Sequence, residues 1–281
     1  MTPFVVAAVA LLIVAWLVAE PFVAERRRSR LRARTFPAAW RGIIDRRVPY
    51  ASRLPRELRA RLEGHVQVFM AEKNFVGCDG FEITEEVRVT IAAQACLLVL
   101  NRKSYYFPRL RDILVYPGAF VVESVVPVGP ALQSHMSRVL SGESSARGQV
   151  VLSWSDVLEG AAHPGHGRNV VIHEFAHQLD QEKGYANGAP WLGRRDRYAR
   201  WSRVMGEEFG RLQYNAATGQ PSLLSHYGAV DPAEFFAVAS EAFFEQPRLV
   251  AHLHPALYAE LCGVYRVDPR LFDWSDQPPV T

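Results

Sequence analysis

The segment His173-Glu174-Phe175-Ala176-His177 constrains this chain more than any other part of the sequence. In a helix of 3.6 residues per turn, residues four apart lie one above the other, so His173 and His177 point to the same side. That spacing lets two imidazoles bind one tetrahedral metal ion. Glu174 is displaced by about 100° around the helix axis, so its carboxylate flanks the metal position without binding it. A carboxylate in that place is typical of the general base for a metal-activated water.

The neighbouring residues predict where this helix begins and ends. Asn169 is a suitable N-cap and Gly184 a suitable C-terminal stop, so we expect a helix over residues 169–183. Apolar residues surround the motif and would bury the helix beside a site: Val171, Ile172, Phe175 and Leu179. A histidine pair on a solvent-exposed helix is the alternative without metal, and this apolar setting argues against it.

A catalytic zinc ion takes three protein ligands and leaves a fourth position for water, so a third ligand must come from downstream. The pattern HExxHxxGxxH is absent, because Asp180 stands where that pattern has glycine. A second helix, predicted over residues 232–244, follows Asp231, which is a suitable N-cap. This helix carries Glu234 and Glu241, which are seven residues apart and therefore lie on roughly the same face.

Either of these two carboxylates can be the third ligand. The rest of the helix is nearly all apolar, and an uncompensated carboxylate buried in such surroundings would be costly. We favour Glu234 as the metal ligand and Glu241 as a residue that supports a ligand through a hydrogen bond.

Residues 2–19 carry no charge and are apolar almost throughout. Eighteen helical residues at about 1.5 Å each cover roughly 27 Å, just enough for the core of a bilayer. Positive charge lies wholly after this run, which argues against a cleaved signal peptide. The positive-inside rule then predicts a single-pass anchor in the bacterial inner membrane with the following domain in the cytoplasm. Because the span is short, a helix buried in a soluble cytoplasmic domain stays open as the alternative.

Six arginines follow the apolar run: Arg26, Arg27, Arg28, Arg30, Arg32 and Arg34. With Glu20 and Glu25 they give residues 1–34 a net charge of +4, so a chain of net charge +3 leaves −1 for the remainder. A near-neutral domain lacks the basic surface of a nucleic-acid binder, so we expect no direct contact with nucleic acid.

The remaining pattern indicates an α+β fold, mainly helical with a small sheet, preceded by one transmembrane helix. We expect an anchor over residues 1–24, a solvated basic juxtamembrane linker over 25–35 and one domain over 36–281. Helices are predicted over 56–73, 91–100, 194–210 and 255–265, strands over 113–116, 119–126 and 149–154, a turn over 77–80 and a loop over 160–167. The last strand either pairs with extended substrate or only packs.

Five separated segments resemble the Mlc titration factor A family of zinc peptidases: HEFAHQLD, YGAVDPAEFFAVASEAFF, GFEITEEVRVTIAAQACLL, ILVYPGAFVV and GQVVLSW. The resemblance covers most of the chain from about Phe36, and the family is in turn similar to the catalytic domain of anthrax lethal factor, a gluzincin. It implies a zincin-like metallopeptidase domain with one Zn²⁺ per chain. The implied zinc ligands are His173, His177 and Glu234, with Glu174 as catalytic base and proton shuttle.

The resemblance also implies that Tyr227 points into the site, where its phenol would stabilise the tetrahedral oxyanion. The alternative is a tyrosine that only packs at the start of a helix. Asp180 is expected to orient a ligand histidine. Peptidase activity on short substrates, including aminopeptidase activity, and binding of a transcriptional repressor of the Mlc type are implied by the family.

The leading functional hypothesis is hydrolysis of peptide bonds, in which zinc activates a water and Glu174 takes its proton. One alternative is a non-proteolytic protein that sequesters a transcriptional regulator. The other is a membrane-tethered scaffold with a vestigial metal site. The intact Glu174 favours the enzyme, since a purely structural site needs only the ligands.

Overall fold

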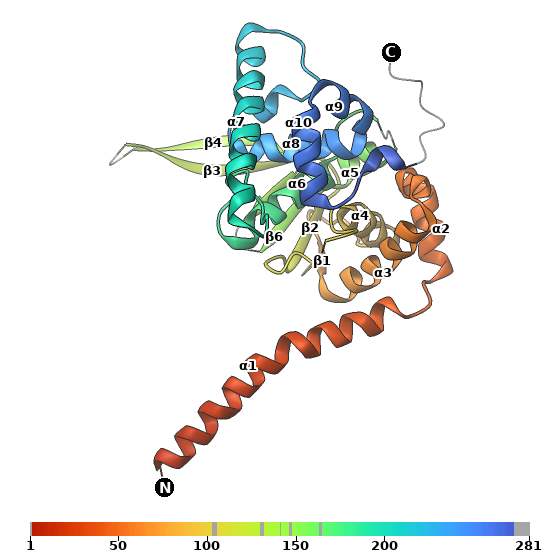
Figure 1. Cartoon of the computed structure of the whole chain (residues 1–281), viewed down its shortest axis with the longest axis vertical. Coiled ribbons are helices and arrows are strands. Elements are labelled where there is room, and N and C mark those ends of the chain that lie inside the picture. The colour runs from red at the N-terminus through yellow and green to blue at the C-terminus, as the bar shows by residue number, and fades with distance from the viewer. Residues whose placement is uncertain are drawn as a thin grey trace.

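A computed structural model of the chain describes residues 2–102, 106–129, 132–140, 142–145, 148–162 and 165–272. The helices are α1 (Thr2–Arg32), α2 (Ala38–Arg47), α3 (Arg56–Glu72), α4 (Glu85–Leu97), α5 (Trp154–Ala162), α6 (Val170–Asp180), α7 (Arg195–Thr218), α8 (Pro232–Glu245), α9 (Pro247–Leu253) and α10 (Pro255–Tyr265). The strands are β1 (Asn74–Gly77), β2 (Asp112–Tyr116), β3 (Phe120–Gly129), β4 (Leu132–Leu140), β5 (Gly142–Ser145) and β6 (Gln149–Ser153). The fold is mainly helical with a small sheet, as predicted (Figure 1).

The main sheet has the strand order β1-β2-β6-β5. Strands β1, β2 and β6 are parallel, and β5 pairs antiparallel with β6. Alternate residues of β2 and β6 are buried, which matches strands packed by their apolar positions against helices. The predicted strand over 149–154 therefore lies inside the sheet with a neighbour on each side. It packs rather than pairing with substrate, and β5 takes the edge position.

Helices α3 and α4 were predicted by their apolar patterns, and both form. Thr84 caps α4 by accepting a hydrogen bond from the backbone N–H of Val87, and the helix is buried on nearly all sides. Because α4 lies between the parallel strands β1 and β2, it belongs to a crossover connection. Helices therefore lie before the sheet and between its strands as well as after it.

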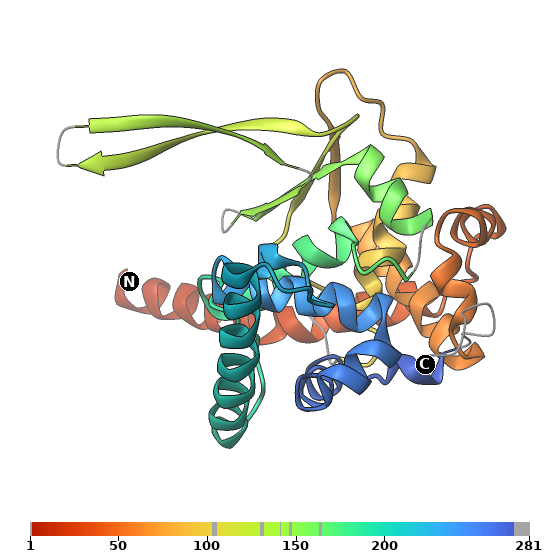
Figure 2. The ribbon, with the colours of Figure 1, turned by 90° about the horizontal axis from the view of Figure 1, so that it is seen from above.

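Several boundaries differ from those expected. Helix α7 continues eight residues beyond the predicted end at residue 210 and stops before Gly219, whose φ of +68° is suited to a helix C-terminus. Helix α5 extends into the segment expected as a glycine-rich loop. Strand β3 is predicted, but its hairpin partner β4 is not; the two form a separate ribbon that stands away from the body (Figure 2).

Helix α1 projects from the domain as one continuous helix (Figure 1). Among the described residues it is the one helix long and apolar enough to cross a membrane, and its apolar window is fully exposed. The alternative of an N-terminal helix buried in the domain is therefore wrong.

The basic stretch after the apolar span is helical through Arg32 and not simply solvated. Arg28 makes two hydrogen bonds of 2.9 Å to the carboxylate of Glu72 on α3, and Arg32 donates to the hydroxyl of Tyr106 at 3.1 Å. The expected linker thus holds the end of α1 against α3.

Candidate metal centre

Helix α6 places both motif histidines because its start is fixed locally. The side chain of Asn169 accepts a hydrogen bond of 3.0 Å from the backbone N–H of Ile172, as expected for the N-cap. The apolar residues on the inner face are fully buried, and Phe175 packs edge-on against Phe107 with ring centroids 4.8 Å apart. The helix therefore holds its polar motif at the edge of the core.

The side chains of His173, His177 and Glu234 meet in one cluster whose ligand atoms all lie within 4.8 Å of one another. The Nε2 atom of His173 is 3.0 Å from Oε2 of Glu234 and 3.2 Å from Nε2 of His177, and Nε2 of His177 is 3.6 Å from the same carboxylate oxygen. Donors bound at about 2.0–2.1 Å to a tetrahedral ion lie roughly 3.4 Å apart. Two imidazole nitrogens and one carboxylate oxygen at these separations fit a zinc ion.

The carboxylate of Glu241 lies behind this cluster. Its Oε1 accepts a hydrogen bond of 2.8 Å from Nδ1 of His173, and its Oε2 accepts one of 2.6 Å from the backbone N–H of Asn169. A proton on Nδ1 leaves Nε2 of the same ring with its lone pair toward the cluster. The structure thus brings Glu234 among the candidate ligands and Glu241 behind them, in the arrangement that we favoured.

Charge within the cluster is coupled. Burial alone would lower the pKa of His173, but hydrogen bonds to Glu234 and Glu241 raise it well above its usual value. Burial would raise the pKa of Glu234, yet its hydrogen bonds with His173 and His177 hold it well below its usual value. The Glu234 carboxylate is therefore negative and attracts protons on the histidine rings. A metal cation bound at the cluster would replace those protons.

Glu174 is buried, and among the described residues its Oε2 atom has no hydrogen-bond partner. Burial raises the pKa of this carboxyl to about 7, although both neighbouring histidines act in the opposite direction. Strand β5 passes directly over it: a Cβ atom at Gly142 would lie 2.5 Å from Oε1 of Glu174. The carboxylate is thus confined between α6 and the sheet edge.

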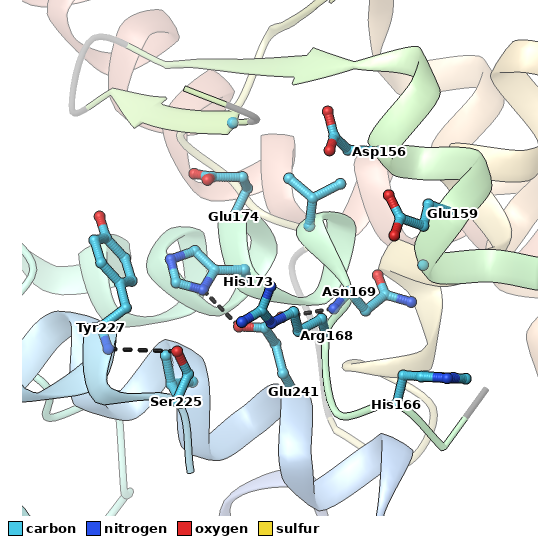
Figure 3. Close-up of a pocket in the computed structure, with 14 residues that line it drawn as sticks. Asp156, Glu159, His166, Arg168, Asn169, His173, Glu174, Ser225, Tyr227 and Glu241 are labelled. Atoms are coloured by element: carbon cyan, nitrogen blue, oxygen red, sulfur yellow. Dashed lines mark hydrogen bonds and ion pairs between the residues drawn. The ribbon is translucent and has the colours of Figure 1, made fainter. Parts of the chain in front are cut away.

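Tyr227 lies in the short 3₁₀ helix η3 (His226–Ala229) that precedes α8. Its ring centroid is 5.9 Å from that of His173, and half of the residue is exposed to solvent. In Figure 3 its phenol stands beside His173 at the mouth of the cavity. The structure therefore brings Tyr227 to the site.

Asp180 does not orient a ligand histidine by a hydrogen bond. Its two carboxylate oxygens accept from the backbone N–H groups of Asn187, Gly188 and Ala189 at 2.6–2.9 Å. The residue comes at the end of α6, where the chain turns back, so its carboxylate serves the backbone of the returning loop. The expected role of Asp180 is wrong.

Sequence reasoning missed a buried network that joins α6 to α8. The Nδ2 of Asn169 donates to Oε1 of Gln94 at 2.9 Å and to Oε1 of Glu245 at 3.3 Å. Burial raises the pKa of Glu245 to about 7, against the effect of its hydrogen bonds. A glutamate at the end of an apolar helix was the available signal, but its partners lie more than 70 residues away.

A cavity of about 780 Å³ opens in front of His173 and Glu174. Figure 3 shows that α5 and the segment before α6 border it, and residues of the short 3₁₀ helix η3 and of the middle of α8 also line it. A buried carboxylate, a candidate metal-binding cluster and a cavity in the size range of ligand pockets therefore adjoin one another.

Two helices that carry a His-His-Glu cluster beside a small sheet match the HExxH-plus-glutamate arrangement of metallopeptidases. The model of the family described as glucose-regulated metallo-peptidase M90 matches residues 22–266. The chain belongs to this family.

The chain is also similar to individual proteins along most of its length. It is 39% identical over 258 residues to the uncharacterized protein slr2042 of Synechocystis, covering 92% of this chain and 94% of that protein. It is 33% identical over 225 residues to Mlc titration factor A of Salmonella agona, covering 79% and 84%. The Mlc titration factor A of Salmonella typhimurium is 32% identical over the same length.

Proposed function

We propose that this protein is a zinc-dependent peptidase that hydrolyses peptide bonds with Glu174 as general base. The observation that carries the proposal is the triangle of His173, His177 and Glu234 beside the one carboxylate oxygen of Glu174 that has no partner among the described residues. Zinc bound there would polarise the scissile carbonyl and lower the pKa of a coordinated water.

Glu174 supplies the proton transfers. Its carboxylate accepts a proton from the attacking water and later gives it to the leaving amine. A pKa near 7, set by burial, suits a group that must both take and release a proton near neutral pH. Because residue 142 is a glycine, the carboxylate fits under β5. The close backbone of that strand then restricts where the carboxylate can move.

Two further elements support hydrolysis. The phenol of Tyr227 stands at the cavity beside His173, where its hydroxyl can donate a hydrogen bond to the oxyanion of the tetrahedral intermediate. Strand β5 offers an outer edge to which an extended peptide can add as a further strand, since its described strand neighbour is β6 alone.

The decisive test replaces Glu174 by Gln in the full chain. This variant should keep one zinc per chain and lose cleavage of a peptide library by at least ~10³-fold, because the amide cannot accept the proton. His177→Ala should lose zinc as well as activity, while Glu207→Gln on the exposed face of α7 should behave as wild type. Wild-type cleavage by Glu174→Gln would refute the mechanism.

We further propose that α1 anchors the protein in the bacterial inner membrane with the domain in the cytoplasm. The support is its length, its exposure and the arginines that follow it. Removal of residues 2–24 should move the protein from the membrane fraction to the soluble fraction. A soluble full-length chain would contradict the anchor.

Repressor binding is the second candidate function, and it is favoured by similarity to proteins named Mlc titration factor A. A purified Mlc-type repressor should then bind the chain even when Glu174 is replaced by Gln. Loss of binding in that variant would link the repressor to the peptidase site instead.

A further inference from the structure

The cavity extends beyond the groups used for hydrolysis. Its far wall carries Asp156 and Glu159 from α5 and His166 and Arg168 from the segment before α6. Figure 3 shows the Arg168 side chain extending toward His173, while the Asp156 carboxylate points away from Arg168. The proposed mechanism gives Arg168 no task.

The segment that carries Arg168 is held on both sides by α8 and the residue after it. Before Arg168, the backbone N–H of Gly165 donates to Oε2 of Glu245 at 2.7 Å, and Nε2 of Gln246 donates to the carbonyl of Gly165 at 2.7 Å. After it, the N–H of Asn169 donates to Glu241.

Local backbone geometry fixes the same segment. Gly167 has a φ of +76°, and a Cβ atom there would lie 2.9 Å from Oε1 of Gln246. Two buried carboxylates and a glycine-only conformation thus set the path of the chain on either side of Arg168. A backbone held in one conformation in this way is expected of a segment that presents a side chain to a ligand.

Arg168 has no hydrogen bond or ion pair among the residues that the structure describes. The nearby carboxylate of Glu241 is already occupied, since its oxygens accept from His173 and Asn169. The guanidinium is therefore available to an anion in the cavity.

The direction of strand β5 indicates which part of a substrate reaches Arg168. The strand begins at Gly142, where an added Cβ would lie 2.8 Å from Val170 at the start of α6. Two residues later, Oγ of Ser144 accepts a hydrogen bond of 2.7 Å from Gln178, two turns further along α6. Strand β5 thus runs in the same direction as α6.

A peptide that pairs antiparallel with β5 runs the opposite way, from Gln178 toward Val170. Its residues after the scissile bond then leave past Gly142 and enter the part of the cavity that Arg168 lines. The cavity therefore receives the C-terminal side of the substrate.

We infer that Arg168 binds a substrate carboxylate on the C-terminal side of the scissile bond, an inference that rests on the proposed peptidase function. A guanidinium binds a carboxylate through two parallel hydrogen bonds. The carboxylate is either the free C-terminus of a short peptide or the side chain of Asp or Glu in a longer one. The acidic wall formed by Asp156 and Glu159 repels that group and restricts it to the side of Arg168.

The test uses the zinc-loaded full chain in detergent and hexapeptides that wild type cleaves. The peptides differ only after the scissile bond, with a free acid or an amide at the C-terminus and Glu or Gln in the chain. The variants are Arg168→Gln, Arg168→Lys and, as a matched control, Arg195→Gln at the exposed start of α7.

Arg168→Gln should raise KM about tenfold or more for peptides with the carboxylate and leave kcat within about twofold. Amidated, neutral peptides should be unaffected, and Arg168→Lys should recover part of the loss. The acid and amide pairs show whether the C-terminus or a side chain is bound. An equal rise in KM for charged and neutral peptides would overturn the inference. A preference for peptides with Lys or Arg after the scissile bond, lost in Asp156→Asn, would also overturn it.

A binding measurement separates this inference from the proposed function. Fluorescent free-acid and amidated hexapeptides are titrated into the zinc-loaded Glu174→Gln chain with Arg168 intact or replaced by Gln. One outcome is that the free-acid peptide binds only when Arg168 is present while the wild type cleaves no peptide. This outcome would refute hydrolysis but support the subsite. Cleavage with no dependence on Arg168 would refute the subsite alone, and failure of both would refute both.

Discussion

Replacing Gly142 by Ala adds one methyl group at the point where strand β5 passes over Glu174, the proposed general base. The new Cβ would lie 2.5 Å from Oε1 and 2.8 Å from Cγ of Glu174, and 2.8 Å from Cγ2 of Val170. Non-bonded heavy atoms normally approach no closer than about 3.5 Å, so the carboxylate or the strand must move by roughly 1 Å. A misplacement of that size costs about 100-fold in rate, which is about 2.7 kcal/mol of activation free energy.

The assay is steady-state cleavage of a peptide substrate by the zinc-loaded full chain, with metal content and thermal stability measured on the same samples. Gly142→Ala should lower kcat about 100-fold and keep its zinc, because none of the atoms nearest the new Cβ belongs to His173, His177 or Glu234. Gly118→Ala is the matched control, since its Cβ would meet only Oγ of Ser155 at an ordinary 3.8 Å. Wild-type kcat in Gly142→Ala would refute the claim that the strand positions the base.

Three other perturbations probe the surroundings of the site. Glu241→Gln should weaken zinc binding about 10- to 100-fold in competition with a chelator, because Nδ1 of His173 loses its charged acceptor. Tyr227→Phe should lower kcat about tenfold or more with little change in zinc content, since it removes only the hydroxyl. Burial raises the pKa of Glu245 from 4.5 to about 7, so the native state retains a proton that the unfolded chain releases. Stability should therefore fall by up to about 3 kcal/mol as pH rises from 4.5 through 7, and denaturant unfolding of Glu245→Gln should lack that component.

The two helices of the metal centre could be predicted because their signals are local. Asn169 and Asp231 each cap the helix that follows through their own side chains, within three residues. The motif spacing then fixes which side chains share a face. The residues alone favoured Glu234 over Glu241 as the candidate ligand without excluding Glu241, which lies on the same helix face, and the family resemblance added to that preference.

Strand β5 could not be predicted in the same way. Its sequence Gly142-Glu-Ser-Ser145 has no β-branched or aromatic residue and resembles a turn. It becomes a strand because β6 offers an unpaired backbone edge. Pairing of four residues with β6 stabilises the extended conformation, which the intrinsic β-propensity of these residues does not favour. The edge that adjoins Glu174 is therefore a product of tertiary structure.

Charge patterns alone were equally insufficient. The arginines after the apolar segment of α1 predicted a solvated stretch, but Arg28 pairs with Glu72 on α3, 44 residues further along the chain. Asp180 was assigned to a histidine because of its place in the motif, whereas the loop that returns beside it supplies three N–H donors. In both cases a long-range partner decided what the charged group does.

The hydrogen bonds of the buried carboxylates support Glu174 as the proposed general base independently of its motif. The described part of the chain buries five carboxylates: Glu174, Asp180, Glu241, Glu245 and Glu260. A buried carboxylate is costly unless donors satisfy it, and four of the five are held by N–H groups or an arginine. Among these five, only Glu174 has a fully buried oxygen without a hydrogen-bond partner, and it lines the cavity beside the candidate metal ligands. The fold thus leaves one acceptor unsatisfied at the place where hydrolysis requires a water to give up its proton.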